Sequence, residues 1–218
     1  RYGVEPDGVT WTFHLRRGVS FHDGAPFDAE AVKANFTRVL DPVANHKRVS
    51  LFTMIDRVEV VGPLTIRIVT KYPFGAFEPT IAHVSAAIVS PKAASTYDKA
   101  FGSSAEAVAG TGPYRVASWK KDQEIVLERY DAYWGTKGVT KQIVYRPIPE
   151  AAARVLALES GDVDVISRIP ATDIPRLEAR QDINVYKLPG VGAQQFRFNL
   201  AKKPFKDARV RQAISYAI

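Results

Sequence analysis

The amino-acid sequence predicts an α/β fold, and three patterns support this prediction. Residues 114–119 and 124–130 alternate apolar and polar side chains on either side of a polar turn, which is the pattern of a β-hairpin. Residues 28–41 have apolar side chains at helical spacing. From residue 142 to residue 188, strand and helix patterns alternate, and this order favours a β-α-β layer with some parallel pairing.

The segment Gly110-Thr-Gly-Pro-Tyr114 precedes the hairpin, and we expect the rest of the chain to be organised around it. Glycine adopts backbone angles that are closed to other residues, and proline fixes its own φ angle. The segment therefore predicts a rigid turn that leads into a short strand. Beyond the hairpin, Asp131-Ala-Tyr-Trp-Gly135 places two large aromatic residues before a chain-reversing glycine.

The first part of the chain predicts a strand, a turn and a helix. Trp11, Phe13 and Leu15 share one face of a strand over residues 11–16, and the Asp-Gly pair of Phe21-His-Asp-Gly24 indicates a turn. Asp28 is a suitable N-cap for the helix that follows. Its buried stripe consists of Val32, Phe36, Val39 and Leu40. We expect the helix to end at Asp41, because a residue before proline avoids the helical region.

The middle and second half of the chain predict further elements, in the following order. Strands are expected at residues 58–61 and 64–69, a helical turn up to 82, a strand at 87–89 and a helix at 92–97. After the hairpin come a strand at 142–146, a helix from 149 to 161, a strand at 162–166, a helix at 173–179, strands at 183–188 and 194–199, and a helix at 207–218.

Composition limits the class of protein. The chain has 218 residues, of which 46% are hydrophobic and 24% charged, as in ordinary soluble globular proteins. Because cysteine is absent, disulfides, thiol nucleophiles and cysteine-based zinc sites are excluded. No apolar run approaches the roughly 20 residues of a membrane span. The net charge of +7 is spread along the chain, without the basic stripe and interleaved aromatics of a typical nucleic-acid binder.

Two other functional classes remain as alternatives. A small hydrolytic enzyme would need a nucleophile and a base within reach, but the sequence has neither Gly-x-Ser-x-Gly nor His-Glu-x-x-His. Asp162 and Asp164 share one face of a predicted strand, but no titratable partner lies beside them in the sequence. His14 and His22 lack a nearby third ligand, so we predict no metal site. An anion-binding or nucleic-acid-binding module is supported by net charge alone.

Seven blocks resemble, in order, the extracytoplasmic solute-binding proteins of ABC importers for peptides, nickel and glutathione, that is, bacterial family 5. The blocks are residues 11–16, 19–24, 26–32, 110–114, 133–135, 160–165 and 199–213. The glutathione and peptide binders are the most similar members. The nickel binders resemble the chain less, because loop 43–48 has no clear histidine cluster.

The resemblance implies a lobe of the type II periplasmic-binding-protein kind, with a mixed β-sheet flanked by helices and most of the second lobe missing. We expect a first-lobe subdomain at residues 1–88, the main first-lobe domain at 89–191, and a crossing strand with the start of the second lobe at 192–218. The apolar stripe of the last helix, Val210, Ala213, Ile214 and Ala217, stops without a cap. We therefore expect a piece of a longer protein, which self-associates through this stripe when isolated.

The function implied by the resemblance is capture of a small peptide-like solute in a cleft between two lobes, followed by delivery to an ABC permease in the cytoplasmic membrane. It implies a periplasmic protein that is monomeric at full length, is not an enzyme, and uses no catalytic residue, metal, cofactor or nucleic acid. The solute stays open: a peptide, glutathione, a nickel chelate, an opine or another compound.

Three segments provide the candidate solute contacts. In loop 43–48 these are Asn45, His46 and Arg48, and the Arg48 guanidinium can hold a carboxylate through two parallel hydrogen bonds. By family position, His83 and Ser85 border the cleft. Gln195 and Arg197 lie on a predicted strand whose backbone can pair with an extended peptide. The glycines of Leu188-Pro-Gly-Val-Gly192 suit a hinge before this strand.

Overall fold

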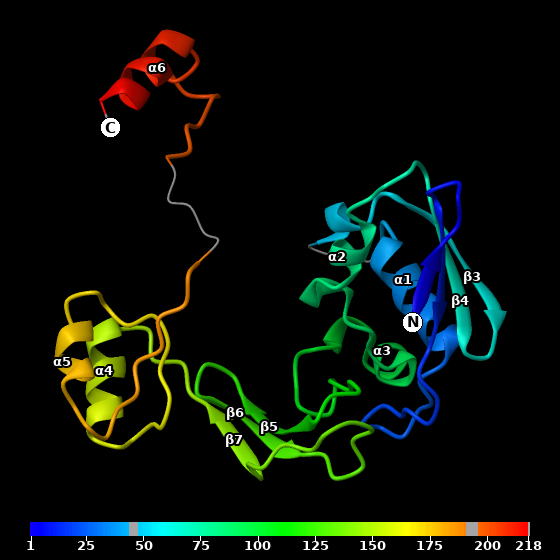
Figure 1. The fold of residues 1–218 in the computed structure, drawn as a ribbon, viewed down its shortest axis with the longest axis horizontal. Helices are drawn as coiled ribbons and strands as arrows, with labels where there is room; N and C mark the ends of the chain where they lie inside the picture. Colours follow the sequence, from blue (N-terminus) through cyan, green and yellow to red (C-terminus); the bar gives the residue numbers. More distant parts are fainter. Residues whose placement is uncertain (44–47, 191–195, 218) are drawn as a thin grey trace. The chain divides into compact units, whose positions relative to one another are not determined.

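The fold is taken from a computed structural model, which describes residues 1–43, 48–190 and 196–217 (Figure 1). The chain forms two compact units, Arg1–Ile148 and Pro149–Ile218, and each is described by itself. The domain boundaries expected after residues 88 and 191 remain predictions.

A four-stranded antiparallel sheet begins the first unit. Its strands are β1 (Tyr2–Val4), β2 (Thr10–His14), β3 (Ile55–Gly62) and β4 (Thr65–Thr70), in the order β1-β2-β4-β3. Trp11 of β2 pairs with Ile68 of β4, and both side chains are buried. The alternation that predicted a strand at residues 11–16 therefore places its apolar face in the core.

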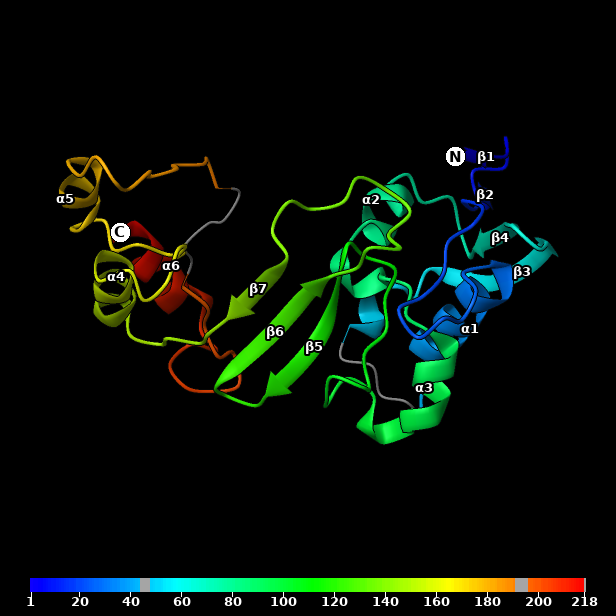
Figure 2. The same cartoon turned by 90° about the horizontal axis from the view of Figure 1, so that it is seen from below.

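Helix α1 (Ala29–Leu40) packs against this sheet (Figures 1 and 2). It begins as predicted: the Asp28 carboxylate accepts a hydrogen bond from the Ala31 N–H at 2.9 Å, which satisfies one free donor of the first turn. It ends at Asp41, whose backbone is extended before Pro42. Phe36 and Val39 of its stripe are buried in the same core as Ile66 and Ile68.

One short helical segment precedes β3, and four more follow β4. They are η1 (Val49–Leu51), α2 (Phe77–Ile81), η2 (Val84–Ala86), α3 (Pro91–Tyr97) and η3 (Asp98–Ala100). The strand expected at residues 87–89 is wrong, because this segment pairs with no strand among the described residues. It leads directly to Ser90, which caps α3 through its side chain.

A second, three-stranded sheet completes the first unit (Figure 2). The strands β5 (Tyr114–Lys120), β6 (Glu124–Arg129) and β7 (Gln142–Tyr145) are antiparallel and adjacent in chain order. Tyr114 pairs with Arg129 and Lys120 with Glu124. The hairpin predicted after the glycine-rich turn is therefore confirmed.

The second unit contains the predicted helices without the predicted strands. Helices α4 (Ala151–Glu159), α5 (Ile174–Glu178) and α6 (Ala208–Tyr216) are present. Residues 162–166, 183–188 and the described part of 194–199 form no strand, so the expected parallel β-α-β pairing is wrong. A strand requires a hydrogen-bonded neighbour.

At the end of α4, the backbone of the strand predicted at residues 162–166 makes hydrogen bonds to the helix instead of to another strand. The N–H groups of Asp162 and Val163 both donate to the Ala157 carbonyl, at 2.9 and 3.2 Å, after Gly161 reverses the chain with a φ angle of +79°. The N–H groups of residues 162 and 163 therefore satisfy a carbonyl at the C-terminal end of α4.

The apolar stripe predicted for the last helix is only partly covered. In α6, Val210 and Ile214 are half-buried, whereas Ala213 and Ala217, the residue after the helix, are exposed. Self-association through this stripe remains a prediction.

Candidate functional site

His22 joins the glycine-rich turn to the first part of the chain. Its Nε2 lies 2.9 Å from the Gly112 carbonyl oxygen, and its Nδ1 accepts from the Gly110 N–H at 3.4 Å. In return, the His22 N–H donates to the Gly110 carbonyl at 2.9 Å. The rings of His22 and Tyr130 meet edge to face, with centroids 4.9 Å apart. The turn Gly110–Tyr114, which the sequence singled out, is therefore held to the loop that contains His22 by three hydrogen bonds, and we call this contact the His22 joint.

Trp134 connects the same turn to the end of the first sheet. Its indole N–H donates to the Thr111 carbonyl at 3.0 Å, and the Arg16 guanidinium lies over its ring, 4.4 Å from the centroid. The blocks 11–16, 110–114 and 133–135 thus meet in space. Sequence reasoning grouped these blocks by resemblance but had no signal for this contact.

His83 and Ser85 lie together on one tight turn. His83 is the N-cap of η2, and its Nδ1 accepts a hydrogen bond from the Ser85 N–H at 3.1 Å. His83 is exposed and Ser85 half-buried, while Ala86 is buried in the main core. Val84 between them is 80% exposed. Sequence reasoning missed Val84, because an isolated valine carries no signal of exposure.

Arg48 precedes η1, and its carbonyl accepts a hydrogen bond from the Leu51 N–H at 3.0 Å. The side chains that follow, Leu51 and Phe52, pack on the same hydrophobic core as Phe77 of α2 and Ala86 of η2. One core therefore supports both the Arg48 segment and the His83 turn.

Four predicted contacts remain besides Arg48, His83 and Ser85. Asn45, His46 and Gln195 lie outside the described residues. Arg197 is exposed and belongs to the second unit, where residues 196–199 are not a strand. The roles of all seven candidate contacts remain predictions.

The described residues provide no clear metal centre. His14 Nδ1 lies 3.3 Å from the Thr65 hydroxyl, and both ring nitrogens of His22 face backbone groups. Across residues 1–43, 48–190 and 196–217, no three His, Cys, Asp or Glu side chains are grouped so that they could hold a metal ion.

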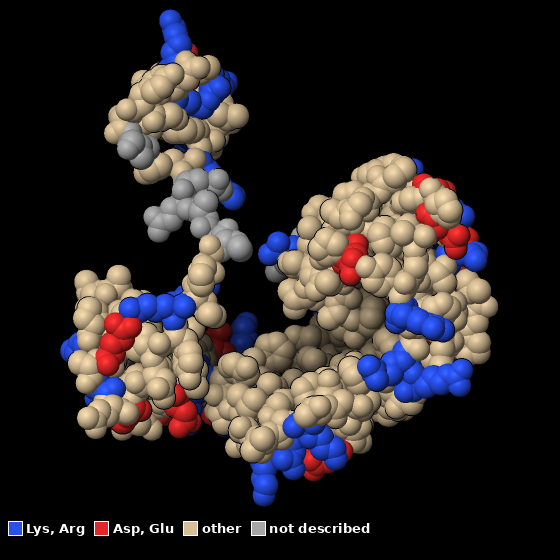
Figure 3. Space-filling model, in the orientation of Figure 1, with Lys and Arg blue, Asp and Glu red and all other residues tan. Residues whose placement is uncertain are grey.

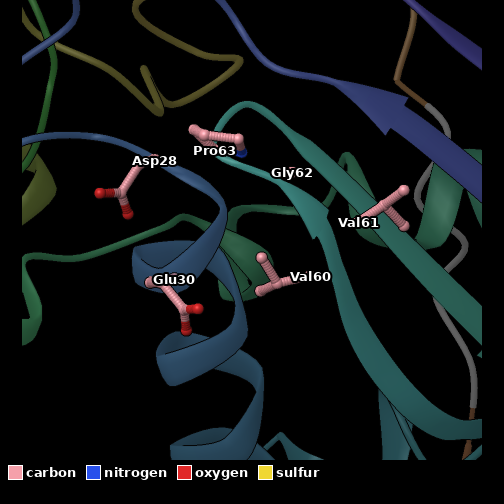
Figure 4. A pocket seen from close by; sticks show the side chains of 6 residues that line it. All are labelled: Asp28, Glu30, Val60, Val61, Gly62 and Pro63. Carbon is pink, nitrogen blue, oxygen red and sulfur yellow. The ribbon is translucent and has the colours of Figure 1, made fainter.

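A shallow hollow of about 370 Å³ lies between the start of α1 and the turn that joins β3 to β4 (Figure 4). It is lined by Asp28, Glu30, Val60, Val61, Gly62 and Pro63. The Asp28 carboxylate there is occupied with helix capping. No candidate contact lines this hollow, so it does not serve as the predicted site.

Surface charges on the first unit occur in separate groups (Figure 3). Arg57 and Arg67 both donate to Glu59, and these bonds hold the pKa of the Glu59 carboxyl below its ordinary value. Arg115 similarly pairs with Glu128. Pairing of this kind is typical of a solvated surface and gives no support to the nucleic-acid alternative.

A protein-family comparison matches the whole chain, residues 1–218, to the bacterial extracellular solute-binding proteins, family 5 middle. The chain belongs to this family. Membership confirms the resemblance inferred from the seven blocks and the interpretation of the chain as part of a binding protein rather than an enzyme.

Curated and structural relatives agree with this assignment. The glutathione-binding protein GsiB of Pectobacterium atrosepticum is 36% identical over 219 residues, covering 100% of this chain and 42% of that protein. The chain thus spans less than half the length of its curated relatives. The periplasmic binding protein DppA of Helicobacter pylori, solved with the peptide STSA, is 26% identical with a TM-score of 0.75, over 83% of this chain and 39% of that one.

A third relative supports the fold alone. NikZ of Campylobacter jejuni, solved with Ni(L-His), aligns with a TM-score of 0.86 at 23% identity, over 100% of this chain and 43% of that chain. The expected α/β fold, as part of a periplasmic binding protein, is confirmed. Among the described residues, no helix has both the length and the apolar character that crossing a bilayer requires.

Proposed function

We propose that this chain is part of the solute-binding component of an ABC importer, which captures a small peptide-like solute between two lobes and delivers it to a permease in the cytoplasmic membrane. The observation that carries the proposal is the 36% identity to a glutathione-binding protein over the whole chain. The DppA relative was solved with a short peptide, which supports the same solute class. The proposed location is the periplasm, where DppA acts as a binding protein.

Binding in this proposal is a conformational equilibrium without chemistry. A solute that contacts both lobes favours the closed arrangement by its differential affinity for that state. Arg48 contributes a guanidinium for a solute carboxylate, and the His83 turn contributes polar groups on the same supporting core.

The test is a thermal-shift and calorimetric titration of the protein at its full natural length. The probes are glutathione, the dipeptide Met-Leu, the tetrapeptide Ser-Thr-Ser-Ala and Ni(L-His). A solute at 100 times its Kd stabilises the folded state by about 2.7 kcal/mol, which gives a clear rise in Tm. We expect this rise with glutathione or with a peptide.

Two variants connect the binding to the predicted site. Arg48→Ala removes hydrogen bonds from a charged donor, worth about 1.5–3 kcal/mol, so we expect affinity to fall roughly 10- to 100-fold. Arg17→Ala removes another exposed arginine of the first unit and is the matched control, with unchanged affinity. A folded protein that responds to none of the peptides would contradict the proposed solute class.

A further inference from the structure

The second sheet has two faces of different character. Its pairing register places alternate side chains of β5, β6 and β7 on the same side. The register shift between Val116 and Ser118 keeps Trp119 on the same side as Val116. This side, which we call the Trp119 face, carries six large apolar side chains: Val116, Trp119, Ile125, Leu127, Ile143 and Tyr145.

The opposite side of the sheet carries mostly charged and polar side chains. Arg115 pairs with Glu128 at 2.5 Å, and Lys120 pairs with Glu124 at 2.8 Å, in both cases across the two strands of the hairpin. Partly exposed ion pairs of this kind are typical of a solvated surface. An antiparallel sheet with one solvated face and one apolar face packs its apolar face against a second layer.

The first unit does not provide this second layer. Within residues 1–43 and 48–148, no helix packs across β5, β6 or β7. None of the six side chains is fully buried, and none belongs to the main hydrophobic core or packs on it. The six are neighbours across the strands, in the rows Trp119–Ile125–Tyr145 and Val116–Leu127–Ile143. They therefore form one continuous apolar patch, which is the mark of an interaction surface.

The length of the related proteins indicates what covers the Trp119 face. The 219 residues aligned with GsiB are 42% of that protein, and the alignment with NikZ covers 43% of that chain. More than half of each relative therefore lies outside the part that corresponds to residues 1–218. A covering segment of the same polypeptide is always present at high effective concentration, whereas a separate partner leaves the apolar patch open to solvent whenever it dissociates.

We propose that the residues of the natural protein outside 1–218 pack on the Trp119 face and form the second layer of this sheet. The occupant is an apolar face of the same polypeptide, rather than a second copy of the chain or another protein. This inference goes beyond the proposed function, because it concerns the assembly of the binding protein and is independent of the solute. It rests only on the chain being part of a longer protein.

Two adjacent residues of β7 provide a matched pair for the test. Tyr145 is on the Trp119 face and Val144 on the opposite face, and they are 58% and 41% exposed. Because residues 1–218 contain no cysteine, Tyr145→Cys and Val144→Cys each add a single thiol to this part of the full-length protein. Maleimide labelling is then followed by mass spectrometry of the peptide that contains the new thiol.

In the full-length protein, we expect the thiol of Tyr145→Cys to react roughly tenfold more slowly than the thiol of Val144→Cys, because a covered thiol is inaccessible to the reagent. Equal rates would show that the Trp119 face stays open to solvent and would overturn the proposal. Protection that appears only as the protein concentration rises, together with a dimer in sedimentation, would assign the face to a second copy and would also overturn it.

Charged substitutions on β6 give an independent measurement. Leu127 lies on the Trp119 face and Val126 on the opposite face, and both side chains are half-buried. Leu127→Asp places an unpaired carboxylate in the proposed interface, so we expect the Tm of the full-length protein to lie at least roughly 3 °C below that of Val126→Asp. A smaller or reversed difference would contradict packing on the Trp119 face. If Leu127→Asp does not fold, the β7 labelling pair still decides.

The outcomes are separable from those of the solute titrations. A full-length protein that binds a peptide but labels equally at positions 144 and 145 would keep the proposed function and refute this interface. A full-length protein that is protected at position 145 but binds none of the peptides would support the interface and contradict the proposed solute class.

Discussion

The Nε2 atom of His22 lies 2.9 Å from the carbonyl oxygen of Gly112, although 90 residues separate the two in the chain. Because Nδ1 of the same ring accepts from the Gly110 N–H, one neutral imidazole satisfies two backbone groups of the glycine-rich turn. The turn that precedes the second sheet is thereby attached to the loop before α1.

Replacing His22 tests the strength of this joint. His22→Ala removes both ring contacts and leaves two half-buried backbone groups unpaired, so we expect the free energy of unfolding to fall by about 1–3 kcal/mol. Urea denaturation measures the loss. His14→Ala, at an exposed histidine with one long contact to Thr65, should change stability by less than about 0.5 kcal/mol. A loss of unfolding free energy for His22→Ala as small as that expected for His14→Ala would mean that the His22 joint contributes little to stability.

Gly138 allows Tyr114 to reach its hydrogen-bond partner. A Cβ atom at position 138 would clash with the Tyr114 hydroxyl group, which donates to the Thr140 carbonyl at 2.8 Å. Gly138→Ala should displace the ring and cost about 1–3 kcal/mol of unfolding free energy. Gly75→Ala is the control, since no atom lies within 4 Å of its added Cβ. A neutral Gly138→Ala variant would show that the Tyr114 ring moves freely.

The Asp7 carboxyl group makes the free energy of unfolding depend on pH in the acid range. Its carboxylate accepts hydrogen bonds from the Thr10 hydroxyl and from the N–H groups of Thr10 and Val9, and these bonds lower its pKa. The stabilisation is therefore complete above the unfolded-state pKa of about 3.9 and is lost as the pH falls through the lower folded-state pKa.

Thermal unfolding between pH 6 and pH 2 tests this dependence. Asp7→Asn keeps an acceptor oxygen but cannot titrate, so its Tm should fall less steeply than the wild-type Tm below about pH 4. Asp131→Asn, at an exposed carboxylate that lies just after β6 and pairs with Arg129, is the comparison variant. Parallel curves for Asp7→Asn and the wild type would rule out a role for Asp7 in the acid transition.

Elements that depend on local sequence were predicted well. Helix α1 starts at Asp28 and ends before Pro42 because its hydrogen bonds join residues four apart, and its cap and its breaker lie within the same segment. The β5–β6 hairpin was likewise recognisable, since its strands are separated by a short turn. The family assignment followed from seven short blocks that occur along this chain in the order of the family.

Elements that depend on distant partners were predicted poorly. The alternation at residues 162–166 indicates which side chains would share a strand face, but it does not indicate whether a neighbouring strand is present. In the structure the N–H groups of residues 162 and 163 donate to the Ala157 carbonyl instead. The hydrogen bond from the Ser85 N–H to His83 Nδ1 was equally hidden, because the sequence pattern predicted no turn at these residues.

The sequence by itself determined the class of protein, the helices, the Asp28 cap of α1, the hairpin and the family. Only the tertiary structure decided that the glycine-rich motif is a joint held by His22, that one core supports both Arg48 and the His83 turn, and that Val84 is exposed. The physical reason is the range of the interactions: helix and hairpin bonds close within one segment, whereas joints and exposed surfaces depend on residues far apart in the chain.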